Sequence, residues 1–501
     1  MFAVAVILTT IVFAGVIVAY VRSGYFSAFH PLSLYALFHA VVFVLRPILS
    51  LFLNYDYVYK AYHFTPTDQD RVVALLVANL GFLSFAFFSL RPSSGATVMK
   101  FVADPLLQSE RNRLARYFVW AMALCAPIAI WSLAGQFGAA FNNEVFSEMK
   151  LDRATGVAYN TSGNGYFVEA QLMLAPLTTI IAWVFRFRLL AMLPFLAFFV
   201  LRAGTGGRGP FVSAAFALGL FYLYQNRAKL PTGRAVLALV AVGLTFVAIG
   251  QDRGYGLRTA LGAETDSRLS FESDEPFLGG MDFANMEYLE YVVYVVPQRS
   301  QTYTYFTELL QVFTEPIPRV LWPGKPIGAP IKMFSMFDYG YPIGATWSLP
   351  GVGWMGLGWP GVIMLCGLWG YGLGWIYRKF AESDQSAFKV AAYMCFMPIM
   401  VVAYRDGLIL TVLRQGIFYM FPIVLWIGIA RFFRVPMASD LRAAMARLRR
   451  RQALHMAPGD APAKVDAPVV AVSDPLDGLP PAVRRRRLAL ANRKQAGAVP
   501  T

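Results

Sequence analysis

Long apolar stretches recur over the first 435 residues and are separated by polar connections. A helix needs about 20 predominantly apolar residues to cross a membrane. The hydrophobic pattern predicts about eleven such helices, over residues 2–21, 31–53, 72–90, 114–136, 166–185, 189–203, 209–225, 235–250, 351–377, 388–404 and 413–433. We therefore expect an all-α, polytopic integral membrane helical bundle.

Composition supports this class. Hydrophobic residues make up 57% of the 501 residues and charged residues 15%, whereas soluble domains carry about a quarter charged residues. Cys125, Cys366 and Cys395 all lie in apolar runs, so neither a disulfide nor a zinc framework is predicted. The histidines have no metal-ligand spacing, and we expect no metal and no cofactor.

The formal net charge of +15 is concentrated in residues 431–501. A basic cytoplasmic segment facing anionic lipid explains this distribution more simply than nucleic-acid binding, so we predict membrane lipids and no nucleic acid as partners. Residues 457–501 are dominated by Ala, Pro, Asp and Val, a composition typical of disorder. We divide the chain into a transmembrane domain, 1–435, and a basic, largely disordered cytoplasmic tail, 436–501.

The short connections give the orientation, because cytoplasmic loops carry an excess of Lys and Arg. With the C-terminus in the cytoplasm, every predicted cytoplasmic connection holds at least one basic residue, among them Arg22, Arg91, Arg186, Arg227 and Arg378. The N-terminus is then external, and the outward loops are 54–71, 137–165, 204–208, 251–350 and 405–412.

Residues 251–350 form one long external loop, rich in Tyr and Trp. A connection of this length is usually a working surface or a disordered linker, and its aromatic content argues against disorder. Tyrosine and tryptophan offer apolar faces beside polar tips, which suits a carbohydrate. We predict glycan contacts at Tyr303, Trp322 and Trp347, although interfacial aromatic residues have the same composition.

Several basic residues face outward, against the bias that places them inside. Such residues need a partner at membrane depth, and Arg suits a diphosphate because its planar fork donates two parallel hydrogen bonds. The predicted diphosphate ligands are Arg208, Arg253, Arg319, Lys325, Arg405 and Arg414. Pairing with acidic residues of the chain is the alternative, the candidates being Asp252, Glu264, Asp282, Glu287, Glu290, Glu308, Asp338 and Asp406.

Three short motifs have simpler structural explanations. Gly204-x-Gly206-x-x-Gly209 and Gly351-x-Gly353-x-x-Gly356 match a dinucleotide fingerprint, but apolar spans flank them where a strand is required. The Gly370-x-x-x-Gly374 pair is predicted to be a helix-packing feature. Asp68-Gln69-Asp70 resembles a metal and nucleotide-sugar element, but acidic residues also favour helix N-termini.

An Arg208-Gly209 turn opens one span, Pro318-Arg-Val-Leu-Trp-Pro-Gly-Lys-Pro326 lies in the long loop, and a Gly-rich segment begins the next span. In this order the features resemble the Wzy-type bacterial polymerases, which join oligosaccharide repeat units into O-antigen, capsule or exopolysaccharide. The resemblance covers roughly residues 20–435. The expected fold is a GT-C-like membrane bundle with a large periplasmic loop, in the bacterial inner membrane.

The resemblance implies a repeat unit on undecaprenyl diphosphate as substrate. It also implies a flippase and a chain-length regulator of the same pathway as partners. A sugar hydroxyl attacks an anomeric carbon and lipid diphosphate leaves, so neither nucleotide nor metal is required. Arg208, Arg319, Lys325 and Arg405 are expected to stabilise the leaving group. Glu308, or else Asp252, is the expected catalytic carboxylate.

Three alternatives remain open. An O-antigen ligase shares nearly all these features. A GT-C-type transferase using a lipid-monophosphate sugar would place acidic residues in the first outer loop, where Asp56, Asp68 and Asp70 stand. A transporter or flippase would need internal repeats and polar residues within the spans. No convincing repeat is found, and Arg46, which lies within a predicted span, would pair with a lipid phosphate or a neighbouring helix.

Overall fold

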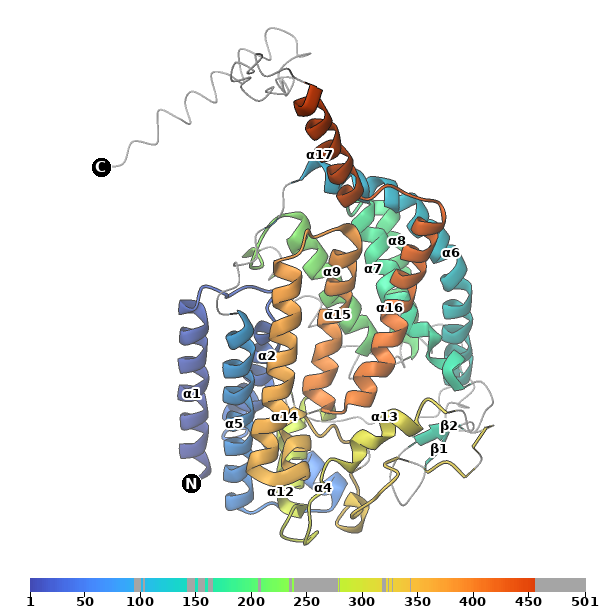
Figure 1. Cartoon of the computed structure of the whole chain (residues 1–501). Coiled ribbons are helices and arrows are strands. Elements are labelled where there is room, and N and C mark those ends of the chain that lie inside the picture. The colour runs from blue at the N-terminus through green and yellow to red at the C-terminus, as the bar shows by residue number, and fades with distance from the viewer. Residues whose placement is uncertain are drawn as a thin grey trace, which may run out of the picture. The chain divides into compact units, whose positions relative to one another are not determined.

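The computed structural model describes residues 1–93, 101, 104–141, 149–151, 158–160, 165–205, 209–233, 237, 278, 280–317, 321–322, 324–326, 328–342 and 344–455. The chain divides into two compact units, Met1–Ala438 and Ser439–Thr501. Apart from one short antiparallel hairpin, β1 (Met149–Leu151) with β2 (Ala158–Asn160), the described elements are helical (Figure 1). Met149 pairs with Asn160 in this hairpin.

The helices follow the hydrophobic pattern closely. Their bounds are α1 (Phe2–Arg22), α2 (Pro31–His39), η1 (Ala40–Leu45), α3 (Arg46–Leu49), α4 (Tyr57–Tyr62), α5 (Asp68–Ser93), α6 (Pro105–Phe141), η3 (Gly165–Met173), α7 (Leu174–Val184), α8 (Leu189–Thr205), α9 (Gly209–Gln225), η5 (Met281–Phe283), α12 (Asn285–Val295), η6 (Thr307–Leu310), α13 (Gln311–Thr314), η7 (Met336–Asp338), α14 (Leu349–Ala381), α15 (Ala387–Asp406), α16 (Ile409–Phe432) and α17 (Ala438–His455).

Seven described helices are long and apolar enough to cross a membrane, which indicates a multi-pass membrane protein. They are Phe2–Arg22, Pro31–Leu49, Asp68–Ser93, Pro105–Gly135, Leu349–Ala381, Ala387–Asp406 and Ile409–Phe432. Glu169–Val184 and Leu189–Arg202 are shorter apolar helices. The predicted count of eleven is not confirmed, and the predicted span 235–250 lies almost wholly outside the described residues.

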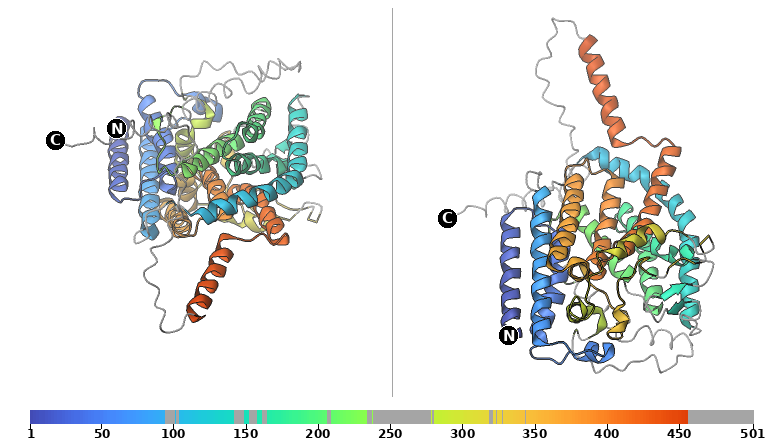
Figure 2. Two further views of the ribbon diagram at one scale, coloured as in Figure 1. Left: turned by 90° about the horizontal axis from the view of Figure 1, so that it is seen from above. Right: turned by 60° about the horizontal axis from the view of Figure 1, so that its bottom comes forward.

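Helices α5 and α14 pack side by side over most of their length (Figures 1 and 2). Glycines allow this close approach. A Cβ at Gly370 would lie 2.6 Å from the carbonyl oxygen of Phe85, and one at Gly374 would lie 2.3 Å from that of Ser89. The predicted packing role of this glycine pair is confirmed. Nearer its start, α14 is kinked where Leu357 and Gly358 leave helical backbone angles.

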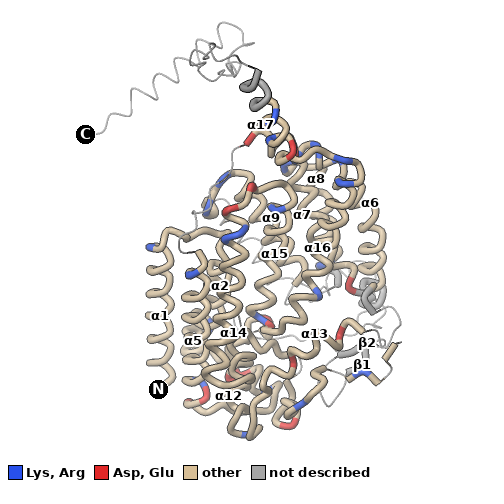
Figure 3. Tube along the Cα trace, in the orientation of Figure 1, with Lys and Arg blue, Asp and Glu red and all other residues tan. Residues whose placement is uncertain are grey.

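The bundle has two chemically different ends. Segments of the long connection, among them α12 and α13, lie at the end of the bundle where α1 begins and α15 ends (Figure 1). Basic positions crowd the opposite end, where α1 finishes and α15 begins (Figure 3). We call the first of these the loop end. The side of the membrane that each end faces remains a prediction from the charge distribution.

Candidate functional site

Two buried carboxylates on α12 fasten the long connection to the bundle. Glu287 lies 2.8 Å from Nε of Arg46, the span residue for which the sequence left the partner open. One turn later, Glu290 accepts a hydrogen bond from the hydroxyl of Tyr59 at 2.5 Å and lies 3.4 Å from Nε of Arg71. Buried charges are tolerated when they are paired. These contacts therefore fix α12 against α3, α4 and α5.

An aromatic cluster lies beside these pairs. The rings of Tyr62 and Tyr288 stack with centres 5.5 Å apart, and Tyr291 contacts Tyr62 at 5.7 Å and Trp347 at 6.5 Å. Tyr288 and Tyr291 are buried and donate their hydroxyl hydrogens to main-chain carbonyls. These two rings therefore belong to the core. Trp347, a predicted glycan contact, is half-buried against the same cluster.

The end of α15 joins the starts of α12 and α14. The carbonyl of Arg405 accepts hydrogen bonds from the Ser348 amide and the Asn285 side chain, both at 2.9 Å. Its guanidinium Nη2 lies 3.3 Å from Asp282, while its Nε has no hydrogen-bond partner among the described residues. Gly407 then has φ +75°, and a Cβ there would lie 2.5 Å from the Ser348 carbonyl oxygen. Because only glycine fits this turn, Arg405 is held in place.

A second arginine stands near the start of α16. Arg414 is exposed, and its Nη1 lies 3.5 Å from Glu169 of η3. Asp406 is within electrostatic range of both Arg405 and Arg414, and the buried Arg202 of α8 is within range of Glu169. Charged positions thus gather at the loop-end turn between α15 and α16 (Figure 3). We define the turn cluster as Glu169, Arg202, Asp282, Arg405, Asp406 and Arg414.

Lys325, a predicted diphosphate ligand, is buried within its own loop. Its Nζ donates to the carbonyls of Glu315 at 2.8 Å and Ile317 at 3.2 Å, and lies 3.4 Å from the Glu315 carboxylate. These contacts join Lys325 to Glu315 and Ile317. The ammonium is therefore already engaged, and it can reach a diphosphate only if the loop rearranges. Trp322, in contrast, is 38% exposed and can offer its ring to a glycan.

Glu308, the first candidate for the catalytic carboxylate, lies on η6. The hydroxyl of Thr304 donates to it at 3.2 Å. Burial raises the pKa of Glu308, and its hydrogen bonds partly oppose this shift. The adjoining α13 packs against α16, the helix that carries Arg414 (Figure 1). A carboxyl group with a raised pKa in this position suits proton transfer.

Tyr303, the remaining predicted glycan contact, lies at the kink of α14. It is half-buried, and a Cβ on Gly358 would lie 3.0 Å from its hydroxyl oxygen. Its ring centre is 6.3 Å from that of Tyr305, which is exposed. Packing against the kinked backbone thus explains why Tyr303 is half-buried. Tyr305 has the more accessible ring.

Other predicted site residues lie outside the described residues, namely Arg208, Asp252, Arg253 and Arg319. The structure therefore brings together Arg405 and Arg414, with Glu308 on a neighbouring element. Glu169 was not among the residues selected from the sequence. The available signal was a carboxylate within a predicted apolar span, a placement that usually marks a functional or paired residue.

The acidic residues of the first outer loop have local partners. Asp70 accepts hydrogen bonds from the amide and hydroxyl of Thr67, at 2.9 and 2.8 Å, at the start of α5. Asp56 pairs with Lys60 at 2.5 Å. Within the described part of the chain, no group of three His, Cys, Asp or Glu residues is placed to hold a metal ion. The Asp68-Gln69-Asp70 element therefore has a helix-capping explanation.

Comparison with known proteins leaves the turn cluster as the main guide to function. No protein-family model matches the chain, and no significant match was found among curated proteins or among solved structures. A functional assignment therefore depends on the chemistry of these residues together with the sequence resemblance stated above.

Proposed function

We propose that the chain polymerises undecaprenyl-diphosphate-linked oligosaccharide repeat units into a bacterial surface polysaccharide. The enzyme would be a metal- and nucleotide-independent glycosyltransferase of the inner membrane, with a GT-C-like bundle of about eleven helices. Its loop end would face the periplasm and its C-terminus the cytoplasm. The turn cluster is the observation that carries this proposal, because Arg405 and Arg414 are only loosely paired at the end of the bundle that also holds segments of the aromatic-rich connection.

The proposed reaction transfers the growing chain from its carrier to a new repeat unit. A hydroxyl of the incoming unit attacks the anomeric carbon of the chain, a new glycosidic C–O bond forms, and the bond to the diphosphate breaks. Glu308 accepts the hydroxyl proton. Arg405 and Arg414 donate hydrogen bonds to the leaving lipid diphosphate, on which charge develops in the transition state. The leaving group supplies the driving force.

An assay with purified full-length protein in detergent tests the proposal. The substrate is the strain's own repeat unit on a lipid diphosphate, and the product is a ladder on a gel. Arg405→Gln should lower the rate by about 100-fold, the usual effect of removing one donor to a developing negative charge. Lys332→Gln, which removes an exposed cation of the same connection, is the matched control and should retain the wild-type rate.

The absence of a ladder from well-folded wild-type protein would overturn the polymerase proposal. Single transfer of glycan to a different acceptor would identify a ligase. Movement of the substrate across a liposome membrane without bond formation would identify a transporter.

A further inference from the structure

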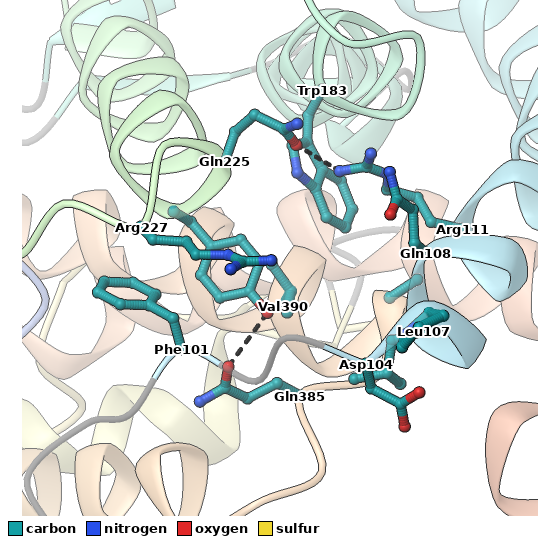
Figure 4. Close-up of a pocket in the computed structure, with 13 residues that line it drawn as sticks. Phe101, Asp104, Leu107, Gln108, Arg111, Trp183, Gln225, Arg227, Gln385 and Val390 are labelled. Carbon is teal, nitrogen blue, oxygen red and sulfur yellow. Dashed lines mark hydrogen bonds between the residues drawn. The ribbon is translucent and has the colours of Figure 1, made fainter. Parts of the chain in front are cut away.

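A pocket of about 200 Å³ lies where α15 begins, at the end of the bundle opposite the loop end. Figure 4 shows its lining residues. Its walls come from α6, the last residues of α7 and α9, and the start of α15. Ala387, at the start of α15, lines the pocket, whereas Arg405 belongs to the turn cluster. At 1.5 Å per residue these two positions are roughly 27 Å apart. The pocket is therefore separate from the site proposed above.

Two buried hydrogen-bond donors in its walls have no acceptor among the residues that the structure describes. Arg111 is 8% exposed and Trp183 is 2% exposed. The Nη1 of Arg111 donates to the side-chain oxygen of Gln225, but neither its Nε nor the indole nitrogen of Trp183 has a hydrogen-bond partner among the described residues. Buried polar groups are normally satisfied, and each exception calls for an explanation. A ligand with acceptor oxygens would satisfy both donors.

The charges around the pocket favour an anion. Arg227 enters from the wall opposite Arg111 (Figure 4), and Arg186 is within electrostatic range of Arg111. Among the lining residues that the structure describes, Asp104 is the only carboxylate, and its Oδ1 accepts the amide hydrogen of Leu106 at the start of α6. Within the described residues, neither Arg111 nor Arg227 forms an ion pair. The positive charge is therefore in excess.

The remaining walls limit the size and kind of ligand. Trp183, Tyr224 and Leu107 contribute apolar surface, and Gln108 and Gln385 contribute side-chain amides. The volume is below that of sites for drug-sized ligands, about 300–1,000 Å³, and suits a phosphate with a small substituent. Basic pockets between transmembrane helices are known to bind anionic lipid headgroups.

We propose that this pocket binds the phosphate group of an anionic ligand. Arg111 and Arg227 donate charge-assisted hydrogen bonds from opposite walls, and the indole N–H of Trp183 donates a third. The phosphate comes either from an anionic membrane lipid, whose headgroup lies at this depth, or from a soluble phosphate ester.

Binding to purified full-length protein in detergent tests the proposal. One arm titrates dioctanoyl phosphatidic acid and counts bound lipid by native mass spectrometry. The other arm measures inorganic phosphate by equilibrium dialysis. Arg111→Gln and Arg227→Gln should each weaken binding about tenfold, as expected for losing one charge-assisted hydrogen bond. Arg188→Gln removes an exposed charge at the same end of the bundle without touching the pocket, and should bind as wild type.

Binding of the lipid alone would identify a lipid headgroup site, and binding of both probes would identify a site for soluble phosphate. If Arg111→Gln does not fold, Arg227→Gln at an exposed position and Trp183→Phe, which keeps an aromatic ring but removes the indole N–H, decide the question. Wild-type affinity in both Arg227→Gln and Trp183→Phe would overturn the proposal. Failure of either probe to bind wild-type protein at millimolar concentration would exclude that source of phosphate, and failure of both would overturn the proposal.

Discussion

The loop end of the bundle holds two kinds of arginine–carboxylate pair. Arg46 and Glu287 are 2.8 Å apart and only 1% and 3% exposed. The other kind has longer distances and more exposed side chains. Arg405 and Asp282 are 3.3 Å apart and 38% and 34% exposed. Arg414 and Glu169 are 3.5 Å apart and 45% and 27% exposed. The same chemical groups thus occupy two very different environments within one end of the molecule.

The difference in burial distinguishes pairs that hold the fold together from pairs whose arginine is available to a ligand. Removing one partner of a buried pair leaves an uncompensated charge and is strongly destabilising. An exposed pair is screened by water and contributes little, about 0–1 kcal/mol. Its arginine can therefore exchange a carboxylate for a phosphate oxygen at small cost. The comparison favours Arg46 as a structural residue and Arg405 and Arg414 as ligands of an anionic substrate.

The largest effect is expected where the buried pair is broken. Glu287→Ala should lower the free energy of unfolding by about 3–5 kcal/mol, because Arg46 is left buried without its counter-charge. Thermal unfolding in detergent measures this loss. Glu382→Ala breaks the exposed Arg378–Glu382 pair at the end of α14, 2.9 Å long, and should cost less than about 1 kcal/mol. Equal losses in the two variants would contradict the comparison.

The free energy of unfolding should depend on pH because of Glu290, the second buried carboxylate of α12. Burial, together with the charge of Glu287, raises the pKa of Glu290 to about 7, from an ordinary value of 4.5. Between these two values the folded protein holds a proton that the unfolded chain has lost, so stability falls as the pH rises through this window. The loss is at most about 3 kcal/mol. Unfolding measured from about pH 5 to 8 should show a flatter profile for Glu290→Gln, and an unchanged slope would refute this assignment.

The smallest effect is expected at the exposed pair of α16. A double-mutant cycle with Arg414→Gln and Glu169→Gln should give a coupling energy for unfolding below about 1 kcal/mol. A parallel cycle on Arg46 and Glu287 provides the contrast. If the Arg414 pair couples as strongly as the buried pair, it belongs to the architecture and not to a ligand site.

The hydrophobic pattern predicted helix positions well because each helix depends mainly on its own residues. The predicted range 209–225 coincides with α9, and 2–21 with α1. The range 31–53 was less accurate, since the helix ends at Leu49 and contains a π-helical segment, Ala40–Leu45. A switch from α-helical to π-helical hydrogen bonding cannot be predicted from the pattern of apolar residues.

The candidate site was only partly predictable. Arg405 and Arg414 stood out because they lie at the ends of apolar spans on the predicted outer side. Lys325 is also a basic residue on the predicted outer side, yet its ammonium donates hydrogen bonds to carbonyls of its own loop. Whether Lys325 is engaged depends on how close it lies to the carbonyls of Glu315 and Ile317, and no local sequence pattern reports that distance. Glu169 did carry a local signal, a carboxylate within a predicted apolar span, but its partner Arg414 lies 245 residues away and could not be identified from the sequence.

The sequence by itself determined that this is a helical, multi-pass membrane protein, because the transfer of an apolar segment into lipid depends on the composition of that segment alone. Tertiary structure decided which charges are buried, which are loosely paired and where donors remain unsatisfied. The pocket containing Arg111, Trp183 and Arg227 illustrates the reason. Its residues come from four separate parts of the chain, and burial and pairing arise only when those parts pack together.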